Sequence, residues 1–498
     1  MSTPLGVEQE LATRSAVRID PDPSRVIAKL FVPGEEVPEH ESRTAAVITR
    51  VLSLDEGQVD AALADTLASF EARHRDLRGT FASHFETVAH RMPRGQELSE
   101  HRRLLVGAYF THEYAIEGAA LCNPSMVAHP DQDGLEDDQT RFVLSARGIG
   151  EGHLSCIELR TGVAGPGTRI TLDPLPPTAV LGRARPPEYE RRLFEEMLSA
   201  HGDDDEVAAF LHRNLPSRFE AAELDRVLRT LPPGLTHRQG THRTIERVQW
   251  IAACTYDLEF PADTRLSERV LWPTGPTERH GMEDARFVRF TDDDGDASYF
   301  ATYTAFDGST VTPQRLQTTD FRLFHTHQLS GPAAANKGMA LFPRKVGGKY
   351  LALSRWDREN TSITVSADNQ TWSIARTIQT PERSWELTQI GNCGSPIETD
   401  AGWLVLTHGV GPMRTYCIGA ILLDLDHPHR LIAHLEDPLI APNADERNGY
   451  VPNVVYSCGA MRHRDTLFIP YGAGDTAIRF VTVPIPALLD RMRPVPSE

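Results

Sequence analysis

The sequence contains no apolar run of the roughly 20 residues that a helix needs to cross a bilayer. Residues 1–20 carry scattered charges and lack the apolar core of a secretory signal peptide. We therefore expect a cytoplasmic protein with no membrane partner.

Positive charge is scarce in this chain. Its 51 lysines and arginines are outnumbered by 69 aspartates and glutamates, which gives a formal net charge of −18 at pH 7. Proteins that bind nucleic acids or anionic membranes need a basic surface, so no nucleic-acid partner is expected. A small basic pocket inside an acidic protein still permits an anionic substrate.

The six cysteines stand singly and form no Cys-x-x-Cys pair. This spacing predicts reduced, mostly buried thiols rather than a disulfide framework. No metal site is expected either. Residues 292–296 resemble a calcium loop but lack the glycine at its sixth position and the glutamate at its twelfth. His325 and His327 have no carboxylate or cysteine at matching spacing as a further ligand.

The 498 residues are too many for one typical domain and predict a large core with an appended piece. We assign residues 1–118 to a loose polar tail, about 1–20, followed by a helical region. Ser53 and Glu56 form a candidate capping box ahead of apolar residues at helical spacing up to Phe70. Two further helical stretches are expected, at about 80–90 and 98–117.

Residues 119–498 show a different sequence pattern, in which short stretches of strand-forming residues alternate with turn sequences such as Asp307-Gly308. Many short strands at even spacing predict an all-β sandwich, barrel or propeller, and the periodicity alone does not choose among them. A helical insertion is expected at about 187–231, ended by Pro232-Pro233-Gly234.

The densest group of chemically active residues lies at 281–290. Successive residues of a strand point to opposite faces, so Glu283 and Asp284 are not expected to face one pocket. One could donate a proton while the other pairs with Arg286, but a surface turn with an ion pair explains the pattern equally well.

Three further groups place a basic or imidazole side chain at the polar end of an apolar strand. These are Lys337, Arg355 and His408. If they converged they would suit a phosphate, although each alone could be a solvated or ion-paired side chain. Asp475 follows another strand and a glycine-rich turn.

A set of motifs falls in order over about 120–185 and 245–485: Gly281–Arg286, Thr302–Ala305, Lys337–Pro343, Gly348–Tyr350 with Arg355, Ser366–Trp372, Gly402–Leu404 with His408, Leu422–Asp424, Gly449–Val455 and Tyr471–Asp475. Taken together, these motifs resemble glycoside hydrolase family 130, the mannoside phosphorylases and related β-mannosidases.

The resemblance implies a five-bladed β-propeller with the active site in its central depression. It implies that Asp284 is the general acid, with Ala285 where the family usually has proline, and that Lys337, Arg355 and His408 bind phosphate. The sugar-binding residues expected from it are Asn123, Arg147, Glu283, Arg286, Tyr303 and Asp475.

The expected reaction is the reversible, inverting phosphorolysis of a β-mannoside, such as a manno-oligosaccharide or mannosyl-glucose, to mannose 1-phosphate. Inverting phosphorolysis needs only the acid because phosphate is the nucleophile, whereas hydrolysis also needs a carboxylate base. Glu386 or Glu398 could be that base, so an inverting β-mannosidase stays an alternative, as does a non-catalytic sugar-binding propeller. No cofactor is expected beyond phosphate as co-substrate, and the helices of about 50–118 predict a homo-oligomer.

Overall fold

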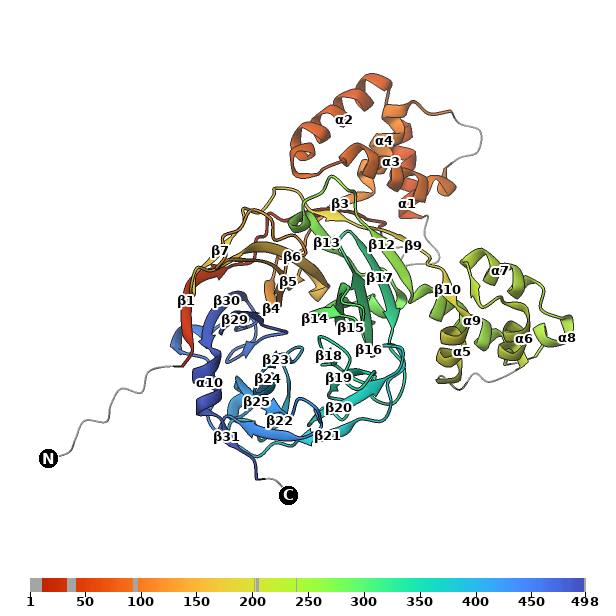
Figure 1. The fold of residues 1–498 in the computed structure, drawn as a ribbon. Helices are drawn as coiled ribbons and strands as arrows, with labels where there is room; N and C mark the ends of the chain where they lie inside the picture. The colour runs from red at the N-terminus through yellow and green to blue at the C-terminus, as the bar shows by residue number, and fades with distance from the viewer. Residues whose placement is uncertain are drawn as a thin grey trace.

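The computed structural model describes residues 11–33, 42–92, 97–200, 202, 206–238 and 240–496. Residues 1–10 of the expected tail lie outside these ranges. Strands predominate, and two groups of helices project from the body that the strands form (Figure 1). Within the described part of the chain, no helix is long and apolar enough to cross a membrane.

The first helical group has its own apolar core. It comprises α1 (Arg43–Leu52), α2 (Glu56–Phe70), α3 (Leu77–Val88) and α4 (Glu100–Tyr109). The expected Ser53–Glu56 capping box is wrong, because Ser53 ends α1 and Asp55 instead caps α2 reciprocally with Gln58. The helix expected to reach residue 117 ends at Tyr109.

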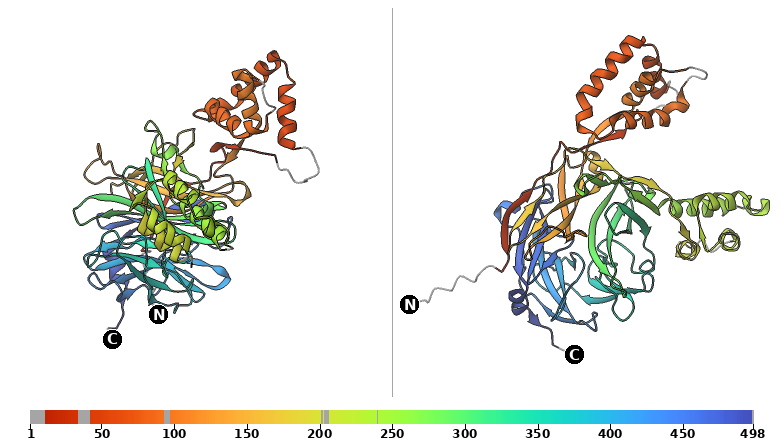
Figure 2. Two further views of the ribbon diagram at one scale, coloured as in Figure 1. Left: turned by 90° about the vertical axis from the view of Figure 1, so that its right-hand side faces the viewer. Right: turned by 45° about the horizontal axis from the view of Figure 1, so that its top comes forward.

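Two short strands, β2 (Val26–Leu30) and β3 (Thr111–Ala115), pair at the base of this helical group. Its core side chains come from all four helices, with Val59, Leu105 and Val106 almost completely buried. The helices therefore bury their apolar faces chiefly against one another, and Figure 2 shows them standing off the strand body.

The second helical group lies beside the outer strands β9 (Arg183–Arg185) and β12 (Tyr256–Glu259). It comprises α5 (Arg191–Ala200), α6 (Glu206–Asn214), α7 (Ala221–Arg229), α8 (Pro233–Thr236), α9 (Thr241–Ala253) and the small pair β10 (Tyr189–Glu190) and β11 (Arg218–Phe219). The expected end at Pro232–Gly234 is wrong. Pro233 occupies the first turn of α8, where the missing N–H of proline removes no hydrogen bond.

The strand body starts with two linked sets of strands. The first set is β4 (Ala120–Ala128), β5 (Thr140–Ile149), β6 (Ser155–Ala164), β7 (Ile170–Leu172), β8 (Val180–Leu181) and β13 (Arg269–Leu271). The second set is β14 (Gly281–Thr291), β15 (Ala297–Phe306), β16 (Val311–Thr318) and β17 (Leu323–Gln328), followed by β12 and β9. One parallel pair, Gly281 with Ser155, joins the two sets.

Three separate sheets complete the body. One contains β18 (Ala340–Leu341), β19 (Tyr350–Ser354), β20 (Thr361–Ser366) and β21 (Arg376–Gln379). The next contains β22 (Gln389–Asn392), β23 (Ile397–Thr399), β24 (Gly402–Val410), β25 (Tyr416–Leu423), β26 (Leu431–His434) and β31 (Arg493–Pro494). The last contains β27 (Val455–Tyr456), β28 (Met461–His463), β29 (Thr466–Ala473), β30 (Ala477–Pro484) and β1 (Thr13–Ile19).

The pairing of β1 with β30 corrects the expected loose tail. Residues 13–19 form the outer strand of the last sheet, with Thr13 opposite Thr482. A strand from near the start of the chain therefore lies beside one from near its end, with helix α10 (Ile485–Arg491) following β30. In Figure 1 the sheets follow one another around a common centre.

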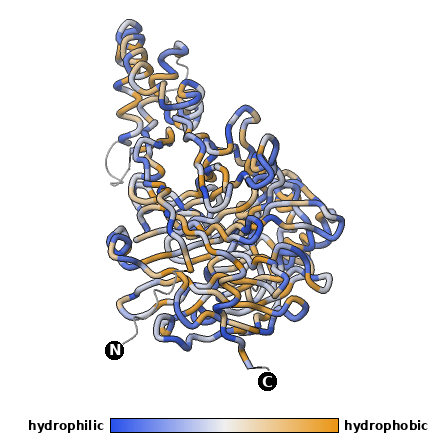
Figure 3. The backbone as a smooth tube through the Cα atoms, turned by 60° about the vertical axis from the view of Figure 1, so that its left-hand side comes forward, coloured by the Kyte–Doolittle hydropathy of each residue, from blue (hydrophilic) through white to orange (hydrophobic). Residues whose placement is uncertain are grey.

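Apolar side chains fill the space between neighbouring sheets. In one cluster, Leu404 and Ile418 of one sheet pack with Ile469 and Val481 of the next. Figure 3 shows apolar segments along the strands and hydrophilic segments in many of the outer loops. The packing fixes each sheet on its neighbours, so the strand ends and loops at the centre are held in place.

Candidate active site

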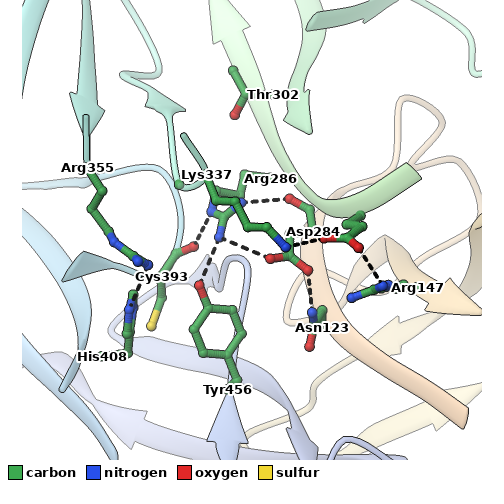
Figure 4. Close-up of polar contacts among 12 residues, drawn as sticks. Asn123, Arg147, Asp284, Arg286, Thr302, Lys337, Arg355, Cys393, His408 and Tyr456 are labelled. Atoms are coloured by element: carbon green, nitrogen blue, oxygen red, sulfur yellow. Dashed lines mark hydrogen bonds and ion pairs between the residues drawn. The ribbon is translucent and has the colours of Figure 1, made fainter. Parts of the chain in front are cut away.

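Strand ends and loops from each sheet of the strand body meet at a cavity of about 200 Å³. Its lining residues are Asn123, Arg147, Asp284, Lys337, Arg355, Gln389, Arg414, Tyr416, Val454, Tyr456 and Asp475. The cavity therefore brings together six of the residues that the sequence assigned to the site, from segments up to 352 positions apart in the chain (Asn123 to Asp475). Figure 4 shows most of this group and its polar contacts.

Asp284 reaches the cavity because strand β14 bulges. The register of β14 on β15 shifts between Glu283 and Arg286, and Asp284 has a φ of 57°, in the left-handed region. Strand β4 has a matching irregularity after Cys122, with Asn123 at φ 49°. Such bulges re-aim side chains, and here Nδ2 of Asn123 donates a hydrogen bond to Oδ1 of Asp284.

Glu283 does not line the cavity, so the expectation that Glu283 and Asp284 do not face one pocket is confirmed. Glu283 accepts a hydrogen bond from Nη2 of Arg147 at 2.7 Å and pairs with Nζ of Lys337. Both partners line the cavity that contains Asp284. Glu283 itself lies behind the lining and holds the two cations.

Arg286 is buried and likewise does not line the cavity. Its Nε donates to the carbonyl of Cys393 at 2.8 Å, one terminal nitrogen donates to the carbonyl of Asp284 at 2.8 Å, and the other donates to the hydroxyl of Tyr456 at 2.9 Å. Its guanidinium lies 3.9 Å from the Asp284 carboxylate. Arg286 therefore fixes the backbone and charge of Asp284 rather than presenting itself to a sugar.

Asp284 is surrounded by positive charge. Burial raises the pKa of its carboxyl group. The charges of Arg286, Lys337 and Arg147, together with the hydrogen bond from Asn123, lower this pKa by more than burial raises it. The pKa of Asp284 therefore lies below its usual value. In the protein alone Asp284 is therefore a carboxylate at neutral pH.

His408 does not reach the cavity, contrary to the expectation that it contacts phosphate. It is fully buried behind Arg355, and its Nε2 lies 2.9 Å from Nη1 of Arg355. Burial and the charges of Arg355 and Arg286 hold the pKa of His408 well below its usual value, so the ring is neutral. Nε2 accepts the hydrogen bond, and the imidazole orients Arg355.

Asp475 follows strand β29 and lines the cavity with a φ of 46°. Burial and repulsion from Asp284 raise the pKa of its carboxyl to about 6, although Arg147 and Arg414 oppose the rise. Its Oδ1, like Oδ1 of Asn123, is buried without a hydrogen-bond partner among the described residues. Two such acceptors at one cavity suit the hydroxyl groups of a sugar.

Tyr303 is placed away from this group. Its side chain lies in an apolar core, and its hydroxyl group hydrogen-bonds to Glu278. Tyr303 does not line the cavity. The motif at 302–305 positions strand β15 beside β14, which explains its presence without a direct sugar contact.

Sequence reasoning missed five of the lining residues: Gln389, Arg414, Tyr416, Val454 and Tyr456. Arg414 lies in a tight loop in which Met413 and Arg414 both have positive φ, at 56° and 55°. The Gly411-Pro412 pair that opens this loop is the signal that could have drawn attention to it. Val454 and Tyr456 lie within or next to the motif at 449–455.

The two glutamates considered as hydrolytic bases lie elsewhere. Glu386 is buried and bonded to Arg383, and Glu398 is exposed and paired with Arg344. Neither lines the cavity. Across the described ranges, no group of three or more His, Cys, Asp or Glu residues is placed to hold a metal ion. His325 instead pairs with Asp257 on the neighbouring strand.

Comparison with known proteins places this arrangement in a family. Residues 261–494 match the family model described as beta-1,4-mannooligosaccharide phosphorylase. The chain is 33% identical over 218 residues to a 1,2-beta-oligomannan phosphorylase of Thermoanaerobacter sp. (strain X514), covering 43% of this chain and 72% of that protein. It is 36% identical over 220 residues to a beta-1,2-mannobiose phosphorylase of the same organism, covering 43% and 70%.

A solved structure is also similar: the beta-1,2-mannobiose phosphorylase of Listeria innocua in complex with beta-1,2-mannobiose. It has a TM-score of 0.44 and 22% sequence identity, covering 76% of this chain and 92% of that one. The sequence matches to the two Thermoanaerobacter relatives extend over more than two thirds of the length of each. The chain therefore belongs to glycoside hydrolase family 130.

Proposed function

We propose that the protein catalyses the reversible, inverting phosphorolysis of a β-mannoside, with inorganic phosphate as nucleophile and mannose 1-phosphate as product. The observation that carries the proposal is one cavity in which the carboxylate of Asp284 lies with the cations of Lys337 and Arg355. The family relatives that bear the names of mannoside phosphorylases support the substrate class.

Phosphate binding is assigned to Lys337 and Arg355. Arg355 is held at one terminal nitrogen by His408, which leaves its other terminal nitrogen for an anion. Lys337, which also lines the cavity, is held by Glu283. Positioned cations of this kind can hold a phosphate dianion in line with the anomeric carbon, which replaces the base that hydrolysis needs.

Asp284 is the proton donor in this reaction. Because a bound phosphate dianion offsets the charge of Lys337, it raises the pKa of Asp284 and allows the carboxyl group to carry a proton. That proton passes to the glycosidic oxygen as its bond to the anomeric carbon breaks, while a phosphate oxygen bonds to that carbon from the opposite face. The departing sugar leaves with a free hydroxyl group.

The mannosyl ring is assigned to the side of the cavity formed by Asn123, Arg147 and Asp475. The unpartnered oxygens of Asn123 and Asp475 accept from sugar hydroxyls, and Arg147 donates. Glu283 and Arg286 act indirectly, by holding Arg147, Lys337 and Asp284.

Hydrolysis is the alternative that one observation favours. Asp475 is the other carboxylate that lines the cavity, and its raised pKa would suit a base that activates water. We favour phosphorolysis because the same cavity holds cations that water does not require.

Incubation with β-1,2- and β-1,4-mannobiose, with and without inorganic phosphate, tests the choice. Phosphorolysis predicts mannose 1-phosphate and a rate that rises with phosphate until saturation. Release of free mannose at a rate independent of phosphate would overturn the proposal in favour of hydrolysis. An Asp475→Asn variant that still binds the mannoside but is inactive in that phosphate-free reaction would then identify the base.

The proposal extends to the architecture. We propose that the sheets are the five blades of a propeller, with β1 completing the last blade and the chain from 119 onward forming the catalytic domain. The helical insertion then extends to Ala253 rather than 231. We further propose a cytoplasmic homo-oligomer in which the helices of 43–109 contact a second copy, which light scattering at micromolar concentration tests.

A further inference from the structure

A second and larger cavity, of about 780 Å³, adjoins the candidate active site. The two cavities share Lys337, Arg355, Gln389 and Tyr416, so they form one continuous groove with an inner and an outer part. The outer part has the size of a pocket for a small molecule, roughly 300–1,000 Å³. It is far larger than the phosphate ion assigned to the inner part requires.

The lining of the outer cavity carries positive charge only. Lys337, Arg355 and Arg358 line it, and no aspartate or glutamate does. Lys337 is offset by Glu283, whereas Arg355 contacts the neutral ring of His408. Two positive charges therefore face the groove without a carboxylate partner among the described residues, in a chain whose net charge is −18.

Arg358 is held in a defined position. Its Nε donates to Oδ1 of Asn336 at 2.8 Å, and Nδ2 of Asn336 donates to the carbonyl of Trp356 at 2.9 Å. Arg358 has a φ of 73° and Asn336 a φ of 61°, both in the left-handed region. A bulky residue is uncommon in this region, and such outliers concentrate at ligand sites.

The remaining nitrogens of the Arg358 guanidinium are the ones left to bind a ligand. A carboxylate lies in the same turn, Asp357, but it accepts from the backbone N–H groups of Glu359 and Asn360 and does not line the cavity. A fixed guanidinium edge matches the geometry of a carboxylate or a phosphate monoester.

We propose that Arg358 and Asn336 form an anion subsite for the acceptor sugar, so that the preferred acceptor carries a phosphate monoester or a carboxylate. The proposal rests on the proposed function, because it assigns the outer cavity to the sugar that leaves in phosphorolysis and accepts mannose in synthesis. Inorganic phosphate occupies the inner part, and the charged group of the acceptor binds at Arg358.

The test runs the reaction in the direction of synthesis, with mannose 1-phosphate as donor. Mannose, mannose 6-phosphate and mannuronic acid are compared as acceptors for the wild type and for Arg358→Gly. Glycine suits a positive φ, so this variant removes the guanidinium without straining the turn. Arg464→Gly is the matched control, because Arg464 is also an exposed arginine at positive φ, 53°, and lies outside both cavities.

We expect the wild type to use an anionic acceptor better than mannose. Arg358→Gly should lower that preference about 10- to 100-fold, because one charge-assisted contact is lost. Arg464→Gly should keep the preference. The two anionic acceptors distinguish a phosphate monoester from a carboxylate. Equal use of mannose and both anionic acceptors by the wild type would overturn the proposal. So would a variant whose main defect is a raised KM for inorganic phosphate, because Arg358 would then belong to the phosphate site.

A binding measurement separates this proposal from the proposed reaction. With saturating inorganic phosphate present, mannose 6-phosphate is titrated into the wild type and Arg358→Gly by calorimetry. Binding that weakens about tenfold or more in the variant supports the anion subsite even if no phosphorolysis is found. Absence of binding to the wild type under these conditions overturns it, since the ester would then only compete for the phosphate site.

Discussion

Arg355 and His408 form a hydrogen bond of 2.9 Å in which the arginine donates to an imidazole nitrogen. The pKa of His408 lies well below its usual value because the ring is buried beside Arg355 and Arg286. A neutral imidazole can accept this bond, whereas an imidazolium could not. The histidine therefore orients the guanidinium that faces the cavity.

This relationship predicts a selective effect of changing His408. Replacement by leucine leaves a nitrogen of Arg355 without its acceptor, so the KM for phosphate should rise about tenfold, with a smaller change in the KM for the sugar. His408→Gln should recover part of the loss, because its amide oxygen can accept the same bond. Steady-state kinetics with each substrate varied in turn measures this. An unchanged KM for phosphate in His408→Leu would contradict the positioning role.

Asp284 should be irreplaceable as the proton donor. Asp284→Asn is nearly isosteric and should lower kcat by at least about 100-fold because the amide cannot transfer the proton. Circular dichroism and thermal melting should show a folded protein. The mannoside should still bind to the variant, which calorimetry can check. A variant with nearly full activity would remove Asp284 from the mechanism.

Asp475 should reduce stability as the pH rises. Its carboxyl has a pKa of about 6 in the folded protein, above its ordinary value near 3.8, so folding favours the protonated form. That contribution is present below about pH 4 and is lost as the pH rises through 6. Asp475→Asn should therefore gain stability over the wild type by an amount on the order of 2 kcal/mol at pH 7.5, with little gain at pH 4.

Thermal melting of the wild type and Asp475→Asn at the two pH values measures this difference in stability. Asp475→Asn should also lose activity, because it loses a sugar contact. A stability difference that is the same at pH 4 and pH 7.5 would contradict the raised pKa.

A buried ion cluster outside the cavity predicts a second pH effect. Glu117 and Glu158 share the cations Arg25 and Arg160. Burial, with repulsion from Glu158, raises the pKa of Glu117 to about 8, although the two arginines oppose this. Folding thus favours the protonated Glu117, and its contribution declines as the pH rises from about 4.5 to 8.

Glu117→Gln should make this decline shallower, because the amide does not titrate. Urea unfolding at pH 5, 6.5 and 8 measures the slope, with the surface variant Glu100→Gln as the control. Parallel pH profiles for the wild type and Glu117→Gln would show that the cluster does not carry the effect.

Most of the helices and the many short strands after residue 119 follow from local patterns in the sequence. Apolar residues at helical spacing predict the helix that contains Val59 and Leu67, and the motifs at 281–286, 337–343 and 471–475 indicate which segments carry the chemistry. Local rules failed at element ends, as at Pro233, because the choice between ending and restarting a helix depends on what the next segment packs against.

Tertiary structure alone decided which side chains share the cavity. The bulges at Asn123 and Asp284 depend on pairing with neighbouring strands, and both side chains line the cavity. His408 is buried behind Arg355, and Tyr303 is buried in an apolar core. The spacing of residues along the chain predicts neither position. Sequence specifies residue types and local conformation, whereas contacts between residues hundreds of positions apart arise only when the sheets pack around their common centre.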